Sequence, residues 1–226
     1  MDRRAFCGAS LGSAALTVAG CSKTPDNAVT EKTPDKLILA GKTLEELRER
    51  YRYDLFDDYL PFLDKYVIDH EYGGFMCNTD RDGTHLNTDK RTWYEGRGIW
   101  VYSYLYNNVK SDPAYLDVAT KSVEFIMKSE PAGKELWCPS FTREGKPTGG
   151  PDVNIYSDMF VANGLQEYSK AVGDTRWWEK AREILLKCVD IYDNRPDYQN
   201  LAATGTAPEV IRPRIMGHWM VLLRCS

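Results

Sequence analysis

Histidine is scarce in this 226-residue chain, and several other common signatures are missing with it. Three histidines are present, His70, His85 and His218. The six cysteines include no C-x-x-C pair, so nothing indicates a structural zinc site or a thioredoxin-like redox centre. The net charge is −4 and no basic stripe is present, which argues against nucleic acid as a partner. The sequence therefore predicts no metal, no other cofactor and no nucleic-acid interface.

Aromatic residues are abundant instead. The chain has 14 Tyr and 6 Trp, and such side chains either fill large cores or stack on sugar rings. The apolar fraction of 42% and the charged fraction of 27% are those of an ordinary globular protein. Length alone allows one domain or two small ones.

Residues 1–20 are typical of an export signal. Arg3 and Arg4 form a positive start, and a short run of small and apolar residues follows from Ala9 to Ala19. The Arg-Arg-x-Phe core resembles a twin-arginine signal, although Asp2 and Cys7 depart from the usual residues. The choice of export route therefore stays open.

Cys21 ends a Val-Ala-Gly-Cys stretch that resembles a bacterial lipobox. Cleavage before Cys21 would leave its thiol for lipid attachment. We expect an exported lipoprotein of the bacterial periplasm or cell envelope, held to the membrane through this lipid. A plain signal peptide with an incidental cysteine is the alternative. Residues 21–41 are polar, contain Pro25 and Pro34, and are interpreted as a flexible tether.

Residues 42–226 alternate between helical and turn-rich segments. Thr43 to Glu46 forms a capping box that opens a helix, which Pro61 should kink or split. Further helices are predicted at 90–109, after Asp112-Pro113, at 154–172, after Asp174 and from 215; hairpins are predicted at 75–86 and 135–148. Helix pairs with hairpins between them favour an α/α toroid or solenoid over an irregular helical bundle.

Arg97 stands out within the helix predicted at 90–109. Gly96 and Gly98 flank it, and a glycine inside a helix costs roughly 1 kcal/mol relative to alanine. The pair therefore suggests the close approach of another group. A buried cation also needs a partner. Local chemistry leaves two interpretations open, a structural ion pair with Glu95 or a neighbouring helix, and a cation that faces a polar ligand.

Two hairpin-and-helix units and the last apolar run carry a recognisable pattern. The first unit is Asp80-Arg-Asp-Gly83, Thr88-Asp-Lys90 and Trp93-x-x-Gly-Arg-x-x-Trp100. The second is Phe141-Thr-Arg-Glu-Gly-Lys-Pro147, Tyr156-Ser-Asp-Met-Phe160 and Asn163-Gly-Leu-Gln-Glu-Tyr168, and the last run is Met216-Gly-His-Trp-Met-Val-Leu-Leu223. In this order and spacing they resemble the N-acylglucosamine 2-epimerase family over about residues 44–223.

The resemblance implies an all-α (α/α)₆ barrel with short β-hairpins in the connecting loops. Its active site would lie at the mouth, where the long loops gather. It also implies interconversion of 2-epimers of an amino sugar, a hexose or a disaccharide, by proton abstraction next to the sugar carbonyl. Arg97 matches the family's active-site arginine, and the resemblance implies that it polarises the carbonyl or the enediolate.

Five further residues are candidate substrate contacts. Trp93 and Tyr94 precede Arg97 by about one turn. Asp158 and Asn163 lie on a predicted inner helix, where Asp158 could equally form an ion pair with Arg97 or contact a sugar hydroxyl. Trp137 could stack on a sugar ring from the second hairpin, with loop packing as its alternative.

The chain departs from the family at the catalytic bases. The family's two catalytic histidines belong to later helices, and none of the three histidines here matches either position. We therefore expect about six helices, the N-terminal part of a truncated barrel, and no epimerase activity from this chain alone. An aldose–ketose isomerase, an (α/α)₆ glycoside hydrolase and a non-catalytic carbohydrate-binding lipoprotein are the alternatives. The sugar and the oligomeric state, including a homodimer, are left open.

Overall fold

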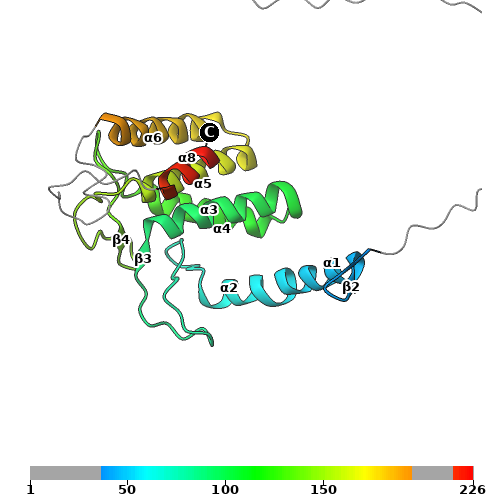
Figure 1. The fold of residues 1–226 in the computed structure, drawn as a ribbon. Helices are drawn as coiled ribbons and strands as arrows, with labels where there is room; N and C mark the ends of the chain where they lie inside the picture. Colours follow the sequence, from blue (N-terminus) through cyan, green and yellow to red (C-terminus); the bar gives the residue numbers. More distant parts are fainter. Residues whose placement is uncertain (1–36, 195–215, 226) are drawn as a thin grey trace, which may run out of the picture. The chain divides into compact units, whose positions relative to one another are not determined.

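The computed structural model describes residues 37–194 and 216–225, which are mainly helical (Figure 1). Its elements are β1 (Ile38–Leu39), β2 (Lys42–Thr43), α1 (Leu44–Tyr53), the π-helical η1 (Asp54–Tyr59), α2 (Leu60–Tyr66), β3 (Lys90–Arg91), α3 (Thr92–Tyr104), the π-helical η2 (Leu105–Val109), α4 (Pro113–Met127), β4 (Ser140–Phe141), α5 (Tyr156–Val172), α6 (Thr175–Asn194) and α8 (Met216–Cys225). The chain divides into two compact units, 1–47 and 48–226. None of the described helices combines the length and hydropathy needed to cross a bilayer.

The described part of the first unit is a small hairpin that runs into α1. β1 pairs antiparallel with β2, with Ile38 opposite Thr43. Ala40 and Gly41 form the turn with φ of 50° and 75°, the left-handed values that a tight two-residue turn requires. The end of the tether predicted at residues 21–41 thus overlaps a hairpin that begins at Ile38. The predicted capping box is present, because Thr43 N donates to Glu46 Oε2 at 2.7 Å and Glu46 N to Thr43 Oγ1 at 3.2 Å.

The second unit has two layers of helices. α3 packs along α5, and α5 packs along α8, so these three helices form one layer (Figure 1). α4 packs on α3 and α6 packs on α5, which makes them a second, outer layer. The most deeply buried apolar residues lie between the layers and under the loops; they are Ile99, Ala119, Ile126, Phe141, Ile155, Met159, Val161, Leu165 and Cys188, all 0% exposed. This arrangement is the alternation of inner and outer helices that a toroid requires.

Local sequence rules account for most of the helix ends. Asp112 accepts a hydrogen bond from Ala114 N at 3.1 Å and begins α4 with Pro113 in the first turn, as predicted. Gly173 ends α5 in the left-handed conformation, with φ of 66°. Pro61 does not break its helix. The chain instead widens into the π-helical η1 just before α2, which accommodates the missing amide hydrogen.

Both predicted hairpins are present, but the regular strand pairing within each hairpin extends over very few residues. Each is limited to an isolated bridge, Thr79 with His85 and Phe141 with Pro147. The paired strands are instead β3 and β4, one from each loop, with Lys90 opposite Phe141. For this reason α3 begins at Thr92 rather than at residue 90. The pairing ties both long loops to the N-terminus of α3.

Gly173 offers a direct test of the C-terminal cap of α5. A Cβ at this position meets no atom within 4 Å, so Gly173→Ala changes only the backbone energy at positive φ. We expect the substitution to lower the free energy of unfolding by about 1 kcal/mol. Urea unfolding followed by circular dichroism measures it.

Gly149 is the matched control for this substitution. It also has open space around a Cβ, but its φ lies outside the left-handed region. Gly149→Ala should leave the stability unchanged or raise it slightly. Equal losses at both positions would contradict a strained cap.

Candidate functional site

Two glycine contacts bring α3 and α5 together and fix how α3 is rotated. A Cβ on Gly96 would overlap the backbone of Phe160 in α5, and a Cβ on Gly164 would overlap the carbonyl oxygen of Gly96. On the other side of α3, a Cβ on Gly98 would overlap the ring of Phe75. The close approach predicted around Arg97 is therefore confirmed on both sides of the helix.

Arg97 is held by aromatic rings. Its guanidinium carbon lies 5.5 Å from the centre of the Trp93 ring and 5.6 Å from the centre of the Phe160 ring. Both distances are within the range of cation–π attraction. Arg97 is exposed, and no carboxylate among the described residues forms an ion pair with it. The guanidinium hydrogens are thus available to an oxygen from outside the chain.

Glu95 does not pair with Arg97, so that ion-pair interpretation was wrong. Glu95 is 0% exposed and its Oε1 accepts a hydrogen bond from Phe75 N at 3.0 Å. Its Oε2 has no hydrogen-bond partner among the described residues. Burial raises the pKa of Glu95 to about 8, against the opposing effects of the Phe75 amide and of Lys90. Glu95 therefore fastens the loop before β3 to the side of α3 that faces away from α5.

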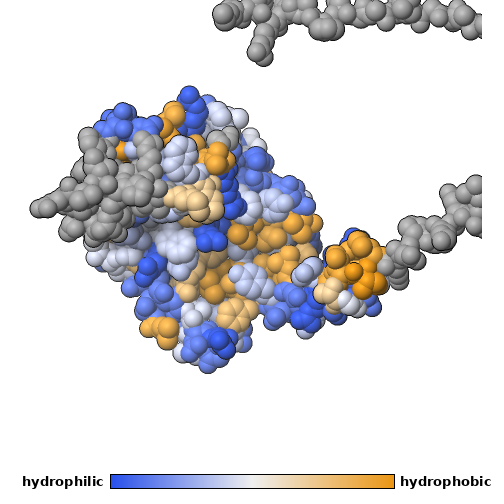
Figure 2. Space-filling view, viewed as in Figure 1, coloured by the Kyte–Doolittle hydropathy of each residue, from blue (hydrophilic) through white to orange (hydrophobic). Residues whose placement is uncertain are grey.

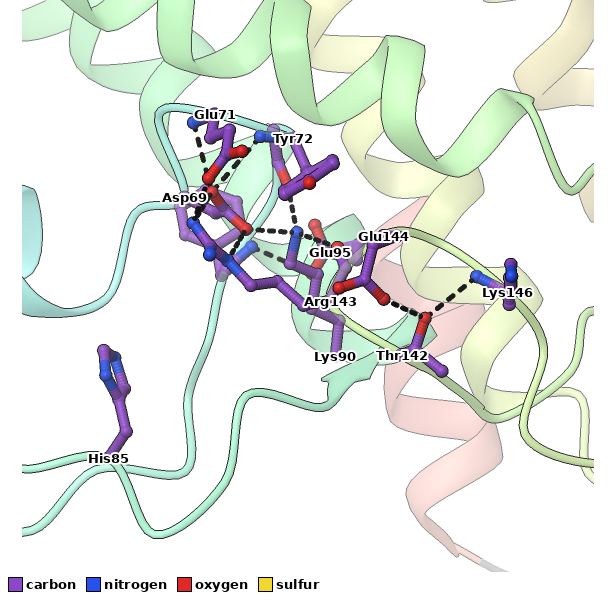
Figure 3. Close-up of polar contacts among 12 residues, drawn as sticks. Asp69, Glu71, Tyr72, His85, Lys90, Glu95, Thr142, Arg143, Glu144 and Lys146 are labelled. Atoms are coloured by element: carbon purple, nitrogen blue, oxygen red, sulfur yellow. Dashed lines mark hydrogen bonds and ion pairs between the residues drawn. The ribbon is translucent and has the colours of Figure 1, made fainter.

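A buried ion cluster lies beside Glu95 and joins both long loops (Figure 3). Lys90 is 0% exposed, and its Nζ donates to Asp69 Oδ2 at 2.9 Å, Gly73 O at 2.6 Å and Arg143 O at 2.8 Å. Arg143 donates to both carboxylate oxygens of Asp69, at 2.9 and 3.0 Å. All three ammonium hydrogens are used, which is the condition under which a buried charge is tolerated. No local sequence pattern marks this cluster, because its members are up to 74 residues apart.

Asp69 is ionised in this cluster. Burial alone would raise the pKa of Asp69, but hydrogen bonds from Arg143, Lys90 and the Tyr72 amide outweigh burial and lower it to about 2. Asp69 therefore keeps its negative charge across the physiological pH range, while burial lowers the pKa of Lys90 against the opposing effect of Asp69. The cluster fixes the loops around the start of α3.

The aromatic surface around Arg97 continues toward α8. The ring of Phe160 stacks with Tyr156 at 6.5 Å between centres, and Tyr156 lies 4.5 Å from the ring of His218. His218 Nε2 lies 3.2 Å from Asn154 Oδ1. Burial lowers the pKa of His218 to about 4, so the imidazole is neutral at pH 7. The structure thus brings a histidine near the arginine surface, which sequence spacing alone did not indicate.

The remaining sequence candidates divide between this surface and the protein interior. Trp93 and Tyr94 lie together, 3.9 Å between ring centres, and both are partly exposed. Trp137 is 1% exposed and its Nε1 donates to Ile126 O at 3.3 Å. Asp158 accepts from Trp137 N at 3.0 Å and forms an ion pair with Lys187 at 2.7 Å, rather than with Arg97. Asn163 is 4% exposed within α5.

His70 and His85 lie in the loop before β3 and bond locally. His70 Nε2 is 3.2 Å from Asp64 Oδ1, and His85 Nε2 is 2.6 Å from Tyr66 O. His85 stands apart from the ion cluster in Figure 3. Across residues 37–194 and 216–225, no group of three or more His, Cys, Asp or Glu is arranged to hold a metal ion.

Known proteins match this chain over its helical part. The family model described as N-acylglucosamine 2-epimerase matches residues 73–208. The human N-acylglucosamine 2-epimerase is 29% identical over 153 residues, which are 66% of this chain and 35% of the human protein. The chain thus spans about a third of the length of the curated relatives it matches.

Solved structures show the same fold. A sugar epimerase from a ruminal bacterium is 25% identical, with a TM-score of 0.56 over 62% of this chain and 36% of that one. The cellobiose 2-epimerase of Spirochaeta thermophila is 21% identical, with a TM-score of 0.61 over 80% of this chain and 47% of that one. The described helices form part of an (α/α)₆ barrel, left open, with short β-hairpins in its loops, as the sequence predicted.

Glu95→Gln should remove a pH dependence of stability. The folded pKa of about 8 lies above the ordinary value of 4.5, so between these values the folded protein binds a proton that the unfolded chain has released. Stability therefore falls as pH rises toward 8. From pH 6.5 to 8 the loss would be about 2 kcal/mol in the natural protein. Glutamine keeps the oxygen that accepts the Phe75 amide and cannot ionise, so the variant should lose less.

Urea unfolding at pH 6.5 and pH 8.5 measures this difference. This window avoids the range below pH 6.5, where protonation of His218 changes stability in the opposite direction. Glu124→Gln, on the exposed face of α4, is the matched control and should follow the natural protein. Parallel pH profiles for all three proteins would contradict a proton held on Glu95.

Proposed function

The chain belongs to the N-acylglucosamine 2-epimerase family, and we propose on that basis that its helices carry the arginine side of a sugar 2-epimerase site. The observation that supports this most directly is Arg97. It is an exposed cation held between two aromatic rings, with no carboxylate paired to it in the described part of the chain. The ligand is the carbonyl end of a reducing sugar, which can be an amino sugar, a hexose or a disaccharide.

The chemistry of 2-epimerisation suits such an arginine. Removal of the proton next to the sugar carbonyl places negative charge on the carbonyl oxygen. A guanidinium stays charged at all working pH values and offers a planar set of donors to that oxygen. A paired carboxylate would compete for those donors. Trp93 and Phe160 instead hold the cation by their ring faces and leave its hydrogens free.

His218 supports the site in another way. A general base works best when its pKa lies near the working pH. The pKa of His218 is about 4, so this imidazole is a weak base at pH 7 but a good hydrogen-bond partner. Because His218 is 0% exposed and packs against Tyr156, we assign it to orienting that ring, and we assign the proton transfers to groups outside the described residues.

Two alternatives share the same surface. An aldose–ketose isomerase passes through the same enediolate and differs only in where the proton returns. A carbohydrate-binding lipoprotein would use Arg97 and the aromatic rings without catalysis. A glycoside hydrolase needs two facing carboxylates, and Asp158 is already paired with Lys187. We therefore rank the hydrolase last.

The cellular setting is part of the same proposal. The twin-arginine-like signal at residues 1–20 exports the protein to the bacterial cell envelope, and the lipid on Cys21 holds it there. Sugar is the small-molecule partner and nucleic acid is not a partner. A homodimer is compatible with this proposal.

Arg97→Gln should abolish most of the sugar affinity. The substitution removes a charged hydrogen bond to the sugar oxygen, and Kd should therefore rise roughly tenfold or more. Titration calorimetry with N-acetylmannosamine and with cellobiose measures this. Arg81→Gln removes another exposed arginine, from the first hairpin, and should bind as the natural chain does. Equal affinity in all three proteins would show that Arg97 does not contribute to sugar binding.

The isolated 226-residue chain should bind sugar without exchanging its C2 proton, because His218, the histidine next to Tyr156, has a pKa of about 4 and is a weak base at pH 7. Proton NMR of N-acetylmannosamine in deuterium oxide follows the C2 signal. Measurable loss of that signal would show that this chain alone is an active enzyme. Appearance of a ketose would favour the isomerase.

A further inference from the structure

The hairpin of the first unit ends in exposed aliphatic side chains. Leu37, Ile38, Leu39 and Leu44 are 58%, 54%, 50% and 52% exposed, and we call these four residues the aliphatic tip. Figure 2 shows them as an apolar patch beside the point where the described chain begins. Soluble monomers seldom gather so many aliphatic side chains on so short a segment, so the patch calls for an occupant.

The backbone of the hairpin is ordered by specific interactions. Ile38 pairs with Thr43 and Leu39 with Lys42 across the turn. Ala40 and Gly41 both have positive φ, as a tight two-residue turn requires. The capping box of Thr43 and Glu46 then fixes the start of α1. The aliphatic tip is therefore presented on a built element.

The composition of the aliphatic tip fits a lipid surface better than a protein. Protein interfaces need a large area and depend on aromatic and arginine anchors, and the aliphatic tip has neither. A bilayer interface accepts aliphatic side chains without shape complementarity. The neighbouring charges, Lys42, Glu45 and Glu46, are of both signs, so they oppose an anionic surface only weakly.

The position of the aliphatic tip in the chain points to the same occupant. Leu37 follows Cys21, the cysteine of the lipobox-like stretch, by 16 residues. A chain of that length spans at most roughly 55 Å even when it is fully extended. A lipid on Cys21 would therefore keep the aliphatic tip within that distance of the bilayer. A weak contact then acts at high effective concentration.

We propose that the aliphatic tip inserts into the interfacial region of the bacterial bilayer and forms a second membrane contact beside the lipid on Cys21. The lipid on Cys21 is the main anchor, and the aliphatic hairpin adds a second, weaker contact close to it. The proposal rests on the lipid attachment proposed at Cys21 and is independent of the sugar site, because it uses only residues of the first unit.

Fluorescence quenching tests insertion directly. The full chain carries Cys21→Ser, so that no lipid is attached, and a Leu39→Trp reporter. Vesicles contain phosphatidylethanolamine and phosphatidylglycerol with brominated acyl chains. We expect the fluorescence added by the reporter to be quenched by about half or more in these vesicles, since bromine quenches on contact. Leu86→Trp, at a position that is 73% exposed in the first loop, is the matched control and should not be quenched. An unquenched reporter at position 39 would overturn the proposal.

Vesicle sedimentation tests the contribution to binding. In the Cys21→Ser chain, Ile38→Asp combined with Leu39→Asp should weaken partitioning onto the same vesicles without bromine by about tenfold or more. Residues 1–20 are present in both proteins, so the comparison isolates the hairpin. Leu86→Asp should partition as the parent does. Unchanged partitioning by the double variant would overturn the proposal. A dimer that only the parent forms in size-exclusion chromatography would make the aliphatic tip a protein contact and would overturn it as well.

Discussion

The buried ammonium of Lys90 is the interaction on which the second unit depends. Lys90 is inaccessible to solvent, and its ammonium group donates its three hydrogens to oxygens of Asp69, Gly73 and Arg143. Because Lys90 belongs to β3, these bonds fix the chain immediately before α3. Both long loops therefore meet at one charged point. Loss of the lysine would leave the carbonyl oxygens of Gly73 and Arg143 without this buried donor, while Asp69 would stay paired with Arg143. Removing a donor from buried acceptors is more costly than breaking an exposed ion pair.

The orientation of α3 follows from this fixed start and from three close backbone contacts. Gly96 and Gly164 let α3 and α5 touch, and Gly98 admits the Phe75 ring on the opposite side. With α3 in this orientation, the guanidinium of Arg97 lies over the ring of Phe160 in α5. The site is thus a product of packing rather than of ion pairing. An arginine in such a setting keeps its donors for a ligand, at the cost of a less tightly held side chain.

Sequence reasoning was accurate where structure is local. The cap at Asp112, the stop at Gly173 and the close approach around Arg97 each follow from a few neighbouring residues. It missed what depends on distant pairing. Arg143 is 74 residues from Asp69, and β3 joins a strand from a different loop, so no periodicity marks either contact. The burial of His218 against Tyr156 was not predicted for the same reason, because this neighbour comes from α5.

The contact between Gly96 and Gly164 carries a consequence for the history of this fold. A Cβ on Gly96 would meet the backbone of Phe160 and Val161, and a Cβ on Gly164 would meet the carbonyl oxygen of Gly96. Because both obstacles are backbone atoms, either position can gain a side chain only if α3 and α5 move apart. Divergence at either glycine therefore requires a shift of the whole α3–α5 layer, and such a shift would also reshape the surface around Arg97.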